Sequence, residues 1–226
     1  MEVAIRAISQ MYALAFLNAA GIEDRQLTRE LKISILNCIN YVSRHYSRFS
    51  SANNHLLVEM TAIGLAGYAF DIPEWKKLAI ETLTKQLPRQ TFPDGVNREV
   101  SLHYHSFALE AYLLMAHVML ASGETLPPSW IPMLDRMSRF LAASMVSDTH
   151  AIEFGDNDEG KILDLEGGHN FCHYSYILQL ASLILSKKYH SFAVESENIS
   201  WLFPEDTIRG IKSKEQIDLT QSITFP

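Results

Sequence analysis

Apolar side chains recur along this chain with the spacing of an α-helix, three or four residues apart, and no segment alternates convincingly as a β-strand would. The first segment with this period is followed by Gly21, a helix stop signal. We therefore predict an all-α protein. The predicted helices cover residues 2–20, 24–47, from Asn53 or Asn54 onward, from Pro73 to near Pro88, from near Val100 to Gly123, 129–146, about 170–188 and, more weakly, 206–213.

Short connections separate most of these helices and carry residues that suit turns and caps. Asn53 and Asn54 are preferred N-cap residues, Pro73 suits a first helical turn, and residues 91–95 have the composition of a turn. Long helices joined by short turns form antiparallel hairpins. Successive hairpins build a bundle, a solenoid or an α/α toroid, and the lack of a repeat at a fixed period counts against a regular solenoid.

The composition is that of a folded globular protein and narrows the classes of partner. The chain has 226 residues, 47% hydrophobic and 20% charged, which is enough for a substantial core. Its formal net charge of −7 disfavours a broad nucleic-acid surface, so we expect no nucleic-acid partner. No apolar run approaches the roughly 20 residues of a membrane span. Cys38 and Cys172 make no disulfide framework, and we expect Cys172 to be a buried structural residue.

A first polar cluster, residues 50–55, precedes the third predicted helix. Asn53 or Asn54 as an N-cap and His55 as a surface residue would explain it without any function. The same geometry also suits ligand binding, because a helix N-terminus offers free N–H groups and positive potential to an anion. The cluster is therefore a candidate anion site.

A second polar cluster, residues 94–105, opens the fifth predicted helix. It contains, in order, Arg98, Glu99, His103, Tyr104 and His105. A half-buried tyrosine in a first turn with two surface histidines is the simple explanation. His103 and His105 are two residues apart and lie on different helix faces, so they cannot readily share a metal ion. We expect no metal site here and favour proton transfer.

The polar, glycine-rich stretch from residue 147 to 168 has no helical period and is predicted as a loop. Within it, Asp156 and Asp158 resemble the start of a calcium loop. No count from them places both Gly at the sixth and Glu at the twelfth position of an EF-hand, so a tight turn is the better interpretation. His169 and His173, which follow, are not predicted to be ligands.

Four motifs follow one another along the chain: Met1–Ile8, Ser51-x-Asn53-Asn54-His55-Leu56, Pro93-Asp94-Gly95-Val96-x-Arg98-Glu99-x-Ser101-x-x-Tyr104-His105, and Gly155-Asp156-x-Asp158-x-Gly160. In this order they resemble the helical domain of the heparinase II/III family of polysaccharide lyases. The resemblance covers residues 1 to about 190. It implies an incomplete α/α toroid built from antiparallel helical hairpins, with an active cleft between the toroid and a following β-sandwich domain.

The resemblance also sets expectations for the flanks. Residues 1–190 would be the toroid, with N-terminal helices of the family domain missing, and residues 191–226 a linker leading towards a C-terminal β-sandwich domain that is absent from this chain. The full-length protein would be bacterial and, like its family, periplasmic or secreted. No cofactor is expected in this chain, since further catalytic residues and the occasional structural metal of the family come from the region after the toroid.

The family chemistry is β-elimination on a uronic acid of an acidic polysaccharide such as a glycosaminoglycan or alginate. By resemblance, Asn54 and His55 would neutralise the uronate carboxylate, and Tyr104 would be the general acid and base. Arg98, Glu99 and His105 would contact substrate, and a cation such as Arg98 or His105 would help Tyr104 to act as a base.

Two other functions remain open from the sequence. A non-catalytic module that binds acidic glycans, or that takes part in surface-polysaccharide assembly, would keep the same fold. A glycoside hydrolase would need two carboxylates flanking the scissile bond, for which Glu99 with Asp156 or Asp158 is the candidate pair.

Overall fold

The computed structural model describes residues 1–49, 52–165 and 172–219, and in these ranges the chain is mainly helical, as predicted. The helices are α1 (Glu2–Ala19), α2 (Arg25–His45), α3 (Asn54–Ala69), α4 (Pro73–Gln90), α5 (Leu102–Ala121), α6 (Trp130–Ser144), α7 (His173–Leu185), α8 (Glu197–Leu202) and α9 (Glu205–Lys212). Two short strands, β1 (Met145–Ser147) and β2 (His150–Ala151), pair antiparallel. Residues 50 and 51 of the first polar cluster, the end of the predicted loop 147–168, His169 and the start of the helix predicted from about 170 lie outside the described residues.

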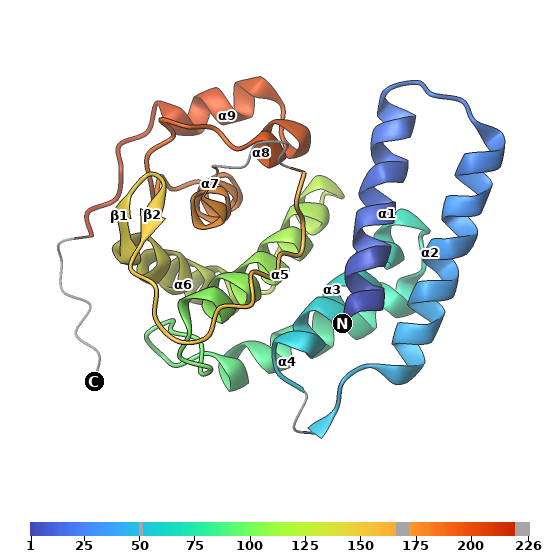
Figure 1. The fold of residues 1–226 in the computed structure, drawn as a ribbon, viewed down its shortest axis with the longest axis horizontal. Coiled ribbons are helices and arrows are strands. Elements are labelled where there is room, and N and C mark those ends of the chain that lie inside the picture. Colours follow the sequence, from blue (N-terminus) through green and yellow to red (C-terminus); the bar gives the residue numbers. More distant parts are fainter. Residues whose placement is uncertain (50–51, 166–171, 220–226) are drawn as a thin grey trace.

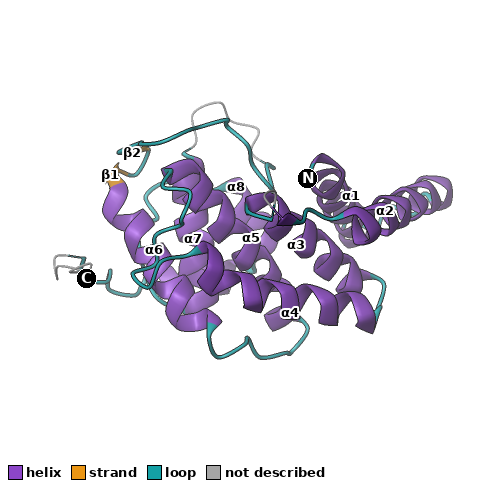
Figure 2. Cartoon of the chain, turned by 90° about the horizontal axis from the view of Figure 1, so that it is seen from below, coloured by secondary structure: helices purple, strands orange, loops and turns teal. Residues whose placement is uncertain are grey.

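The helices are arranged as successive hairpins around two central helices. Figures 1 and 2 show the α1–α2 hairpin at one end of the molecule and α6 and α7 towards the other, with α3 and α5 between them. α3 packs against α1, α2, α4 and α5, and α5 packs in turn against α6 and α7. This order of neighbours is the antiparallel-hairpin arrangement that the sequence predicts for an incomplete α/α toroid.

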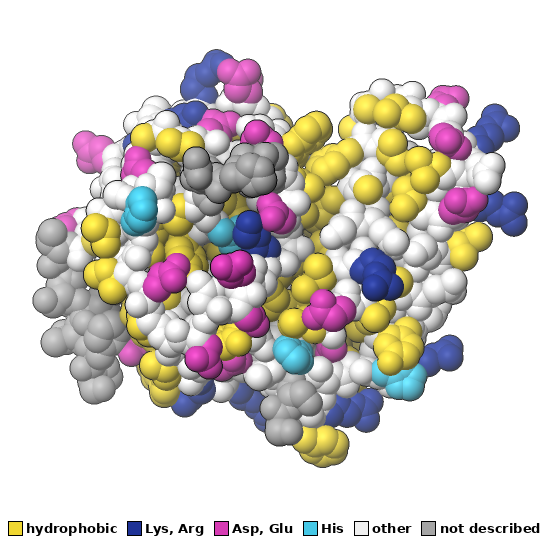
Figure 3. Space-filling view, viewed as in Figure 1, with side chains coloured by type: hydrophobic (Ala, Val, Ile, Leu, Met, Phe, Trp, Pro, Cys, Tyr) yellow, Lys and Arg dark blue, Asp and Glu magenta, His cyan; other side chains and the backbone are white. Residues whose placement is uncertain are grey.

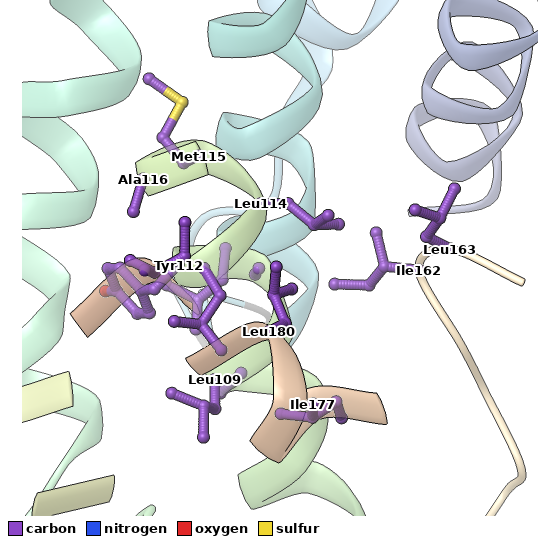
Figure 4. Close-up of a cluster of buried hydrophobic side chains, with 14 of the residues drawn as sticks. Leu109, Tyr112, Leu114, Met115, Ala116, Ile162, Leu163, Ile177 and Leu180 are labelled. Atoms are coloured by element: carbon purple, nitrogen blue, oxygen red, sulfur yellow. The ribbon is translucent and has the colours of Figure 1, made fainter. Parts of the chain in front are cut away.

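The two central helices are buried on nearly every side. α3 is buried from Leu56 to Gly67 and α5 from Phe107 to Ala116, without an exposed polar face. A helix that is apolar all round must be enclosed by its neighbours along its whole length. Figure 4 shows part of this core, where side chains of α5 and α7 meet those of Ile162 and Leu163 from the loop that follows β2. The first turns of α3 and α5 are therefore the parts of these helices that can carry a site.

The segment between α4 and α5 is a turn, as predicted from residues 91–95. The Phe92 N–H donates to the carbonyl of Val96 at 2.8 Å, and Thr91 pairs with Asn97 across the turn. Gly95 has φ +100°, in the region that favours glycine, and a Cβ there would lie 2.6 Å from the Arg136 carbonyl carbon. The turn is thus fixed against α6.

Two elements were not predicted. The β1–β2 hairpin occupies the junction between the sixth predicted helix and the predicted loop, and its strands are too short for a period-two pattern to be read. α8 is a six-residue helix without a usable period. α9 agrees with the short helix predicted near 206–213.

The predicted linker is partly helical in its described portion. α8 and α9 pack against α7, and the side chains of Ile208 and Ile211 are buried. The Ile217 N–H donates to the carbonyl of Lys188 at 2.9 Å. Residues up to at least 217 are therefore packed onto the helical unit, whereas residues 220–226 lie outside the described ranges. The division of the chain at residue 190 stays a prediction.

The two cysteines form no disulfide in the described part of the chain. Cys38 and Cys172 are free thiols, and Cys172 is partly exposed, so its expected full burial is wrong. It lies at the N-cap of α7. No helix in the described part of the chain has the length and apolar character to cross a membrane.

We expect Gly95→Ala to destabilise the fold, because a side chain at this φ both strains the backbone and collides with α6. The expected loss in free energy of unfolding is about 2 kcal/mol or more, measured by urea unfolding. Gly210→Ala is the matched control: Gly210 lies in α9 and no atom lies within 4 Å of the position that its new Cβ would take, so this change should be neutral or stabilising. Equal losses in both variants would contradict the turn geometry.

Candidate active site

A cavity of about 440 Å³ lies where the first turns of α3 and α5 meet. Its lining includes four of the six predicted site residues, Asn54, His55, Glu99 and Tyr104, although α3 and α5 begin far apart in the sequence. The complete lining is Met1, Glu2, Ile5, Asn53, Asn54, His55, Glu99, His103, Tyr104, Phe107, Asp158, Gly160 and Lys161. On the face shown in Figure 3, acidic side chains gather near the hollow centre with few basic ones among them.

The first turn of α3 is held in place by its own cap and by α4. Asn53 is the N-cap, and its side-chain oxygen accepts the His55 N–H at 3.4 Å, as the predicted cap requires. The Gln90 side-chain amide, at the end of α4, donates to the carbonyls of Ala52 and Asn53, each at 3.2 Å. Residues 52 and 53 are therefore hydrogen-bonded to the end of α4.

Asn54 is the residue of this turn with unused hydrogen-bonding capacity. It is 6% exposed, and its side-chain Oδ1 is buried without a hydrogen-bond partner among the described residues. Buried polar atoms nearly always have a partner, so an orphan atom at a cavity wall suits a ligand group or water. Asn54 Oδ1 is thus an acceptor that a donor group of a ligand, or a water, could satisfy at the cavity wall.

Glu99 links the two first turns. Its Oε1 accepts the backbone N–H of Asn54 at 3.4 Å, and its own N–H donates to the side chain of Asn97 at 2.9 Å. Burial raises the pKa of Glu99 above the usual carboxyl range, although the Asn54 N–H and His55 oppose the shift. Glu99 lines the cavity as predicted, and its hydrogen bond shows that it positions Asn54 as well.

The segment 154–160 packs against the N-terminal end of α5. Ser101 is the N-cap: its Oγ accepts the Tyr104 N–H at 3.2 Å and donates to the carbonyl of Asp156 at 2.6 Å. The Leu102 N–H donates to the carbonyl of Phe154 at 3.1 Å. Gly155, at φ +71°, approaches so closely that a Cβ would lie 2.7 Å from Ser101 Cα. These contacts bring Asp158 to the cavity.

Tyr104 faces carboxylates rather than cations. Its hydroxyl donates to Asp158 Oδ2 at 3.4 Å, and burial, followed by the charge of Asp158, raises the pKa of Tyr104. Asp156 and Glu99 act in the same direction. The expectation that a neighbouring cation would help Tyr104 to act as a base is therefore wrong. Tyr104 keeps its proton at neutral pH and is suited to donate it.

His105 does not reach the cavity, so its predicted contact with substrate is not supported by its place in the fold. It is fully buried: its Nδ1 accepts the Asn97 N–H at 3.2 Å, and its Nε2 lies 3.0 Å from the Met137 carbonyl. Burial lowers the pKa of His105 from 6.5 to about 4, so the ring is neutral. His105 ties the α4–α5 turn to α6.

Arg98 is also absent from the cavity lining. Its side chain is exposed, and its guanidinium lies over the Phe92 ring, 4.4 Å from the centroid. Its place on the outside of the turn follows from the Thr91–Asn97 pairing, which directs the next residue to solvent. Of the substrate-contact residues predicted at this turn, Glu99 alone lines the cavity.

The cavity also contains residues that the sequence analysis did not assign to the site. His103 is 7% exposed, and its Nε2 lies 2.9 Å from Asp158 Oδ1. Lys161 is within 3.0 Å of Asp164. His103 was visible in the cluster around Tyr104 and Asp158 in the tight turn, but the sequence contained no signal that the two would meet.

A second cavity of about 610 Å³ adjoins the first and shares His103, Gly160 and Lys161 with it. Its other lining residues are Thr149, Glu153, Asn157, Glu159, Asp164, Cys172, His173 and Tyr174. Burial raises the pKa of the Cys172 thiol, so it is not activated as a nucleophile. His169 lies outside the described residues.

Glu110, which the sequence analysis did not single out, holds the end of the loop that lines these cavities. It is fully buried on α5 and accepts the N–H groups of Ile162 and Leu163 at 3.2 and 3.1 Å, while His173 Nε2 lies 3.1 Å away. One buried carboxylate thus anchors the end of the loop that carries Asp158. Within the described ranges, no group of three or more His, Cys, Asp or Glu side chains is arranged to hold a metal ion.

Comparison with known proteins places this arrangement in a family. Residues 1–166 match the family model described as "Heparinase II/III N-terminus". The chain belongs to the heparinase II/III family. A curated "Heparin-sulfate lyase" from Pedobacter heparinus is 29% identical over 124 residues, which are 52% of this chain and 18% of that protein.

A solved structure shares the fold of this chain. A chain described as "Crystal Structure of Heparinase III" matches with a TM-score of 0.57 and 18% identity, covering 66% of this chain and 23% of that one. This likeness confirms the all-α toroid fold. The chain spans less than a quarter of the length of either relative.

We expect the buried, neutral His105 to make stability depend on pH. Its folded pKa lies below its unfolded value, so the unfolded chain binds the extra proton and stability falls as pH drops from about 6.5 towards 4. The loss amounts to about 3 kcal/mol across that range. His105→Asn should be less stable at neutral pH but show a flatter pH dependence in urea unfolding. Parallel curves for the two proteins would contradict the burial of a neutral ring.

Proposed function

We propose that this chain is the toroid part of a polysaccharide lyase that cleaves a uronic-acid-containing acidic polysaccharide by β-elimination. The observation that carries the proposal is that Asn54, His55 and Tyr104 line one cavity in a member of the heparinase II/III family. Membership of the family indicates the reaction class. The cavity brings together Asn54 and His55, which would bind the uronate carboxylate, and Tyr104, which would donate a proton.

Elimination begins with removal of the proton at C5 of the uronate, which is weakly acidic while the adjacent carboxylate is charged. Hydrogen bonds to that carboxylate lower the cost of the enolate-like charge that develops, as in an oxyanion hole. The side-chain NH2 group of Asn54 would donate to the carboxylate, and Asn54 lies in the cavity lining at the positive end of α3. His55, on the same turn, assists neutralisation or orients the sugar.

Tyr104 would protonate the leaving oxygen at C4. Its raised pKa and its carboxylate neighbours keep the phenol protonated until the C4–O bond breaks. The base that takes the C5 proton is then a different group. Since the chain spans 18% of its curated relative, we assign that base to the part of the site outside this chain.

The substrate class is a uronate polymer such as a glycosaminoglycan or alginate. Among the cavity residues, Glu2, Glu99 and Asp158 are acidic, and Lys161 pairs with Asp164. A densely sulfated chain would need more cations than these residues offer. The rest of the protein, for which we propose a C-terminal β-sandwich domain, would complete the cleft and its charge.

We expect Tyr104→Phe to lower lyase activity by about 10²- to 10⁴-fold, because the leaving oxygen loses its proton donor. The assay follows the ultraviolet absorbance of the new C4–C5 double bond on a panel of sulfated and unsulfated uronate polysaccharides. Tyr41→Phe, on the exposed face of α2, is the matched control and should retain full activity.

The same assay distinguishes a lyase from a non-catalytic module that only binds the glycan. It is run on this chain and on the protein extended through the segment that follows it. Activity in the extended protein alone means that this chain holds half of a site. Binding of a uronate polymer without unsaturated product from either protein would contradict the lyase proposal and favour the glycan-binding or surface-polysaccharide assembly module.

A further inference from the structure

The Glu99 carboxylate and the Oδ1 atom of Asn54 are hydrogen-bond acceptors in the lining of the first cavity, and the elimination chemistry above uses neither of them. We propose that Glu99 is a specificity-determining residue, whose carboxylate accepts a free hydroxyl group of the uronate ring and repels a ring that carries a sulfate ester there. The substrate is then a uronate polymer with unsulfated C2 and C3 hydroxyls. This inference rests on the proposed function and adds to it the selection of the sugar ring.

Hydrogen bonds at both ends of Glu99 fix its position. Its Oε1 accepts the Asn54 N–H at 3.4 Å, and its own backbone N–H donates to Asn97 Oδ1 at 2.9 Å. The side chain is half-buried and lines the cavity. A carboxylate can accept about four hydrogen bonds, so Glu99 keeps capacity for a sugar hydroxyl while it holds the first turn of α3.

The next residue, Val100, has a strained backbone. Its φ of +50° lies in the left-handed region, which β-branched residues rarely adopt, and its side chain is 58% exposed. Strain of this kind persists where the surrounding structure holds it, and it is common at binding sites. Here Val100 turns the chain between Glu99 and Ser101, the N-cap of α5. The strained turn gains nothing from burial of the Val100 side chain, and it places Glu99 at the cavity.

The elimination itself leaves two ring positions of the uronate to determine specificity. C4, C5 and the C6 carboxylate take part in the reaction, whereas C2 and C3 carry hydroxyl groups. Burial raises the pKa of Tyr104, and the charge of Glu99 acts in the same direction, so Glu99 lies close to the phenol that would act at C4. Because C3 is bonded to C4, we assign the C3 hydroxyl and its neighbour at C2 to Glu99.

The acceptors of the cavity favour a hydroxyl over a sulfate at this place. A hydroxyl can donate to Glu99 or to Asn54 Oδ1, which is buried and has no partner among the described residues. A sulfate ester has no hydrogen to donate and brings a negative charge. Like charges that face one another oppose binding, and they exclude the wrong ligand more than they strengthen the right one.

The cations of this chain do not offset that repulsion. Lys161 is the one lysine or arginine in the described lining of the cavity, and it lies 3.0 Å from Asp164. Residues 50–51, 166–171 and 220–226, which the structure does not describe, contain no lysine or arginine in the sequence. The described lining therefore has no unpaired lysine or arginine with which this chain could neutralise a sulfate beside Glu99.

Two substitutions separate the charge of Glu99 from its hydrogen bond to Asn54. Glu99→Gln keeps an oxygen that can accept the Asn54 N–H and removes the charge, whereas Glu99→Asp keeps the charge on a shorter side chain. The extended protein and its variants are assayed for kcat/KM at about pH 8, where carboxylates are ionised. The substrates are hyaluronan, heparosan and alginate, each beside a chemically O-sulfated form of the same polymer.

The unmodified protein should prefer the unsulfated form of the polymer that it cleaves by at least about 100-fold in kcat/KM. Glu99→Gln should reduce this preference at least about tenfold, with less than about tenfold loss on the unsulfated form. Glu99→Asp should keep the preference and lose activity on both forms, because Asn54 loses its support. Glu74→Gln is the matched control: it removes the same charge from the exposed first turn of α4, at the end of that helix away from Gln90, and should change neither value.

An unaltered preference in Glu99→Gln, or a preference of the unmodified protein for the sulfated polymer, would overturn the assignment of Glu99. Glu99→Gln replaces a half-buried carboxylate by a neutral amide of the same shape, so we expect it to fold.

Affinity tests the same residue without catalysis. Dissociation constants are measured with the extended Tyr104→Phe protein for labelled oligosaccharides of the same polymers, sulfated and unsulfated. Adding Glu99→Gln should narrow the ratio of the two dissociation constants at least about tenfold, and an unchanged ratio would contradict the proposal. Lack of product from every polymer with the unmodified protein would remove the lyase function, whereas this ratio would still decide the role of Glu99.

Discussion

The enclosure of α3 and α5 is the constraint on which the rest of this structure depends. Both helices are buried on all sides, so neighbouring elements must cover them along their length. Apart from buried groups such as Glu59 and Glu110, their polar side chains lie in the first turns, and packing α3 directly against α5 sets those two turns beside one another. The cavity lined by Asn54 and Tyr104 is thus a consequence of how the core is closed. A change that loosened the contact of α3 with α5 would separate Asn54 from Tyr104 without altering either residue.

The loop from β2 to Leu165 completes the site, and buried polar contacts hold it where packing alone would not. Glu110 is buried on α5 and accepts two consecutive backbone N–H groups of the loop, while Ser101 holds it at the other end. A buried carboxylate is tolerated because its oxygens are satisfied in this way. The loop delivers Asp158 to α5 beside the Tyr104 hydroxyl. Core stability and site geometry therefore share the same hydrogen bonds.

The charge around Tyr104 decides its chemistry. A phenol beside a cation loses its proton more easily, whereas a phenol beside carboxylates keeps it. Burial raises the pKa of this phenol, and Asp158, Asp156 and Glu99 raise it further, so in the proposed reaction Tyr104 would be the acid and another group the base. Under the proposed function, a uronate carboxylate would be received by the Asn54 amide and the N-terminus of α3, and Lys161 is the lysine in the described lining of the cavity. Division of acid and base between two parts of a protein is consistent with a chain that spans 18% of its curated relative.

The sequence alone determined the all-α fold, most helix positions, a cap at Asn53 or Asn54 and the family, because periodicity, capping and motif order are properties that can be read along the chain. It also showed that His103 and His105 point to different sides of one helix. Which of them faces the cavity was decided by tertiary structure: the Met137 carbonyl on α6 takes up His105 in the core, whereas Asp158 meets His103 at the cavity wall. Both partners are distant from these histidines in sequence, and no local pattern encodes a contact over that separation.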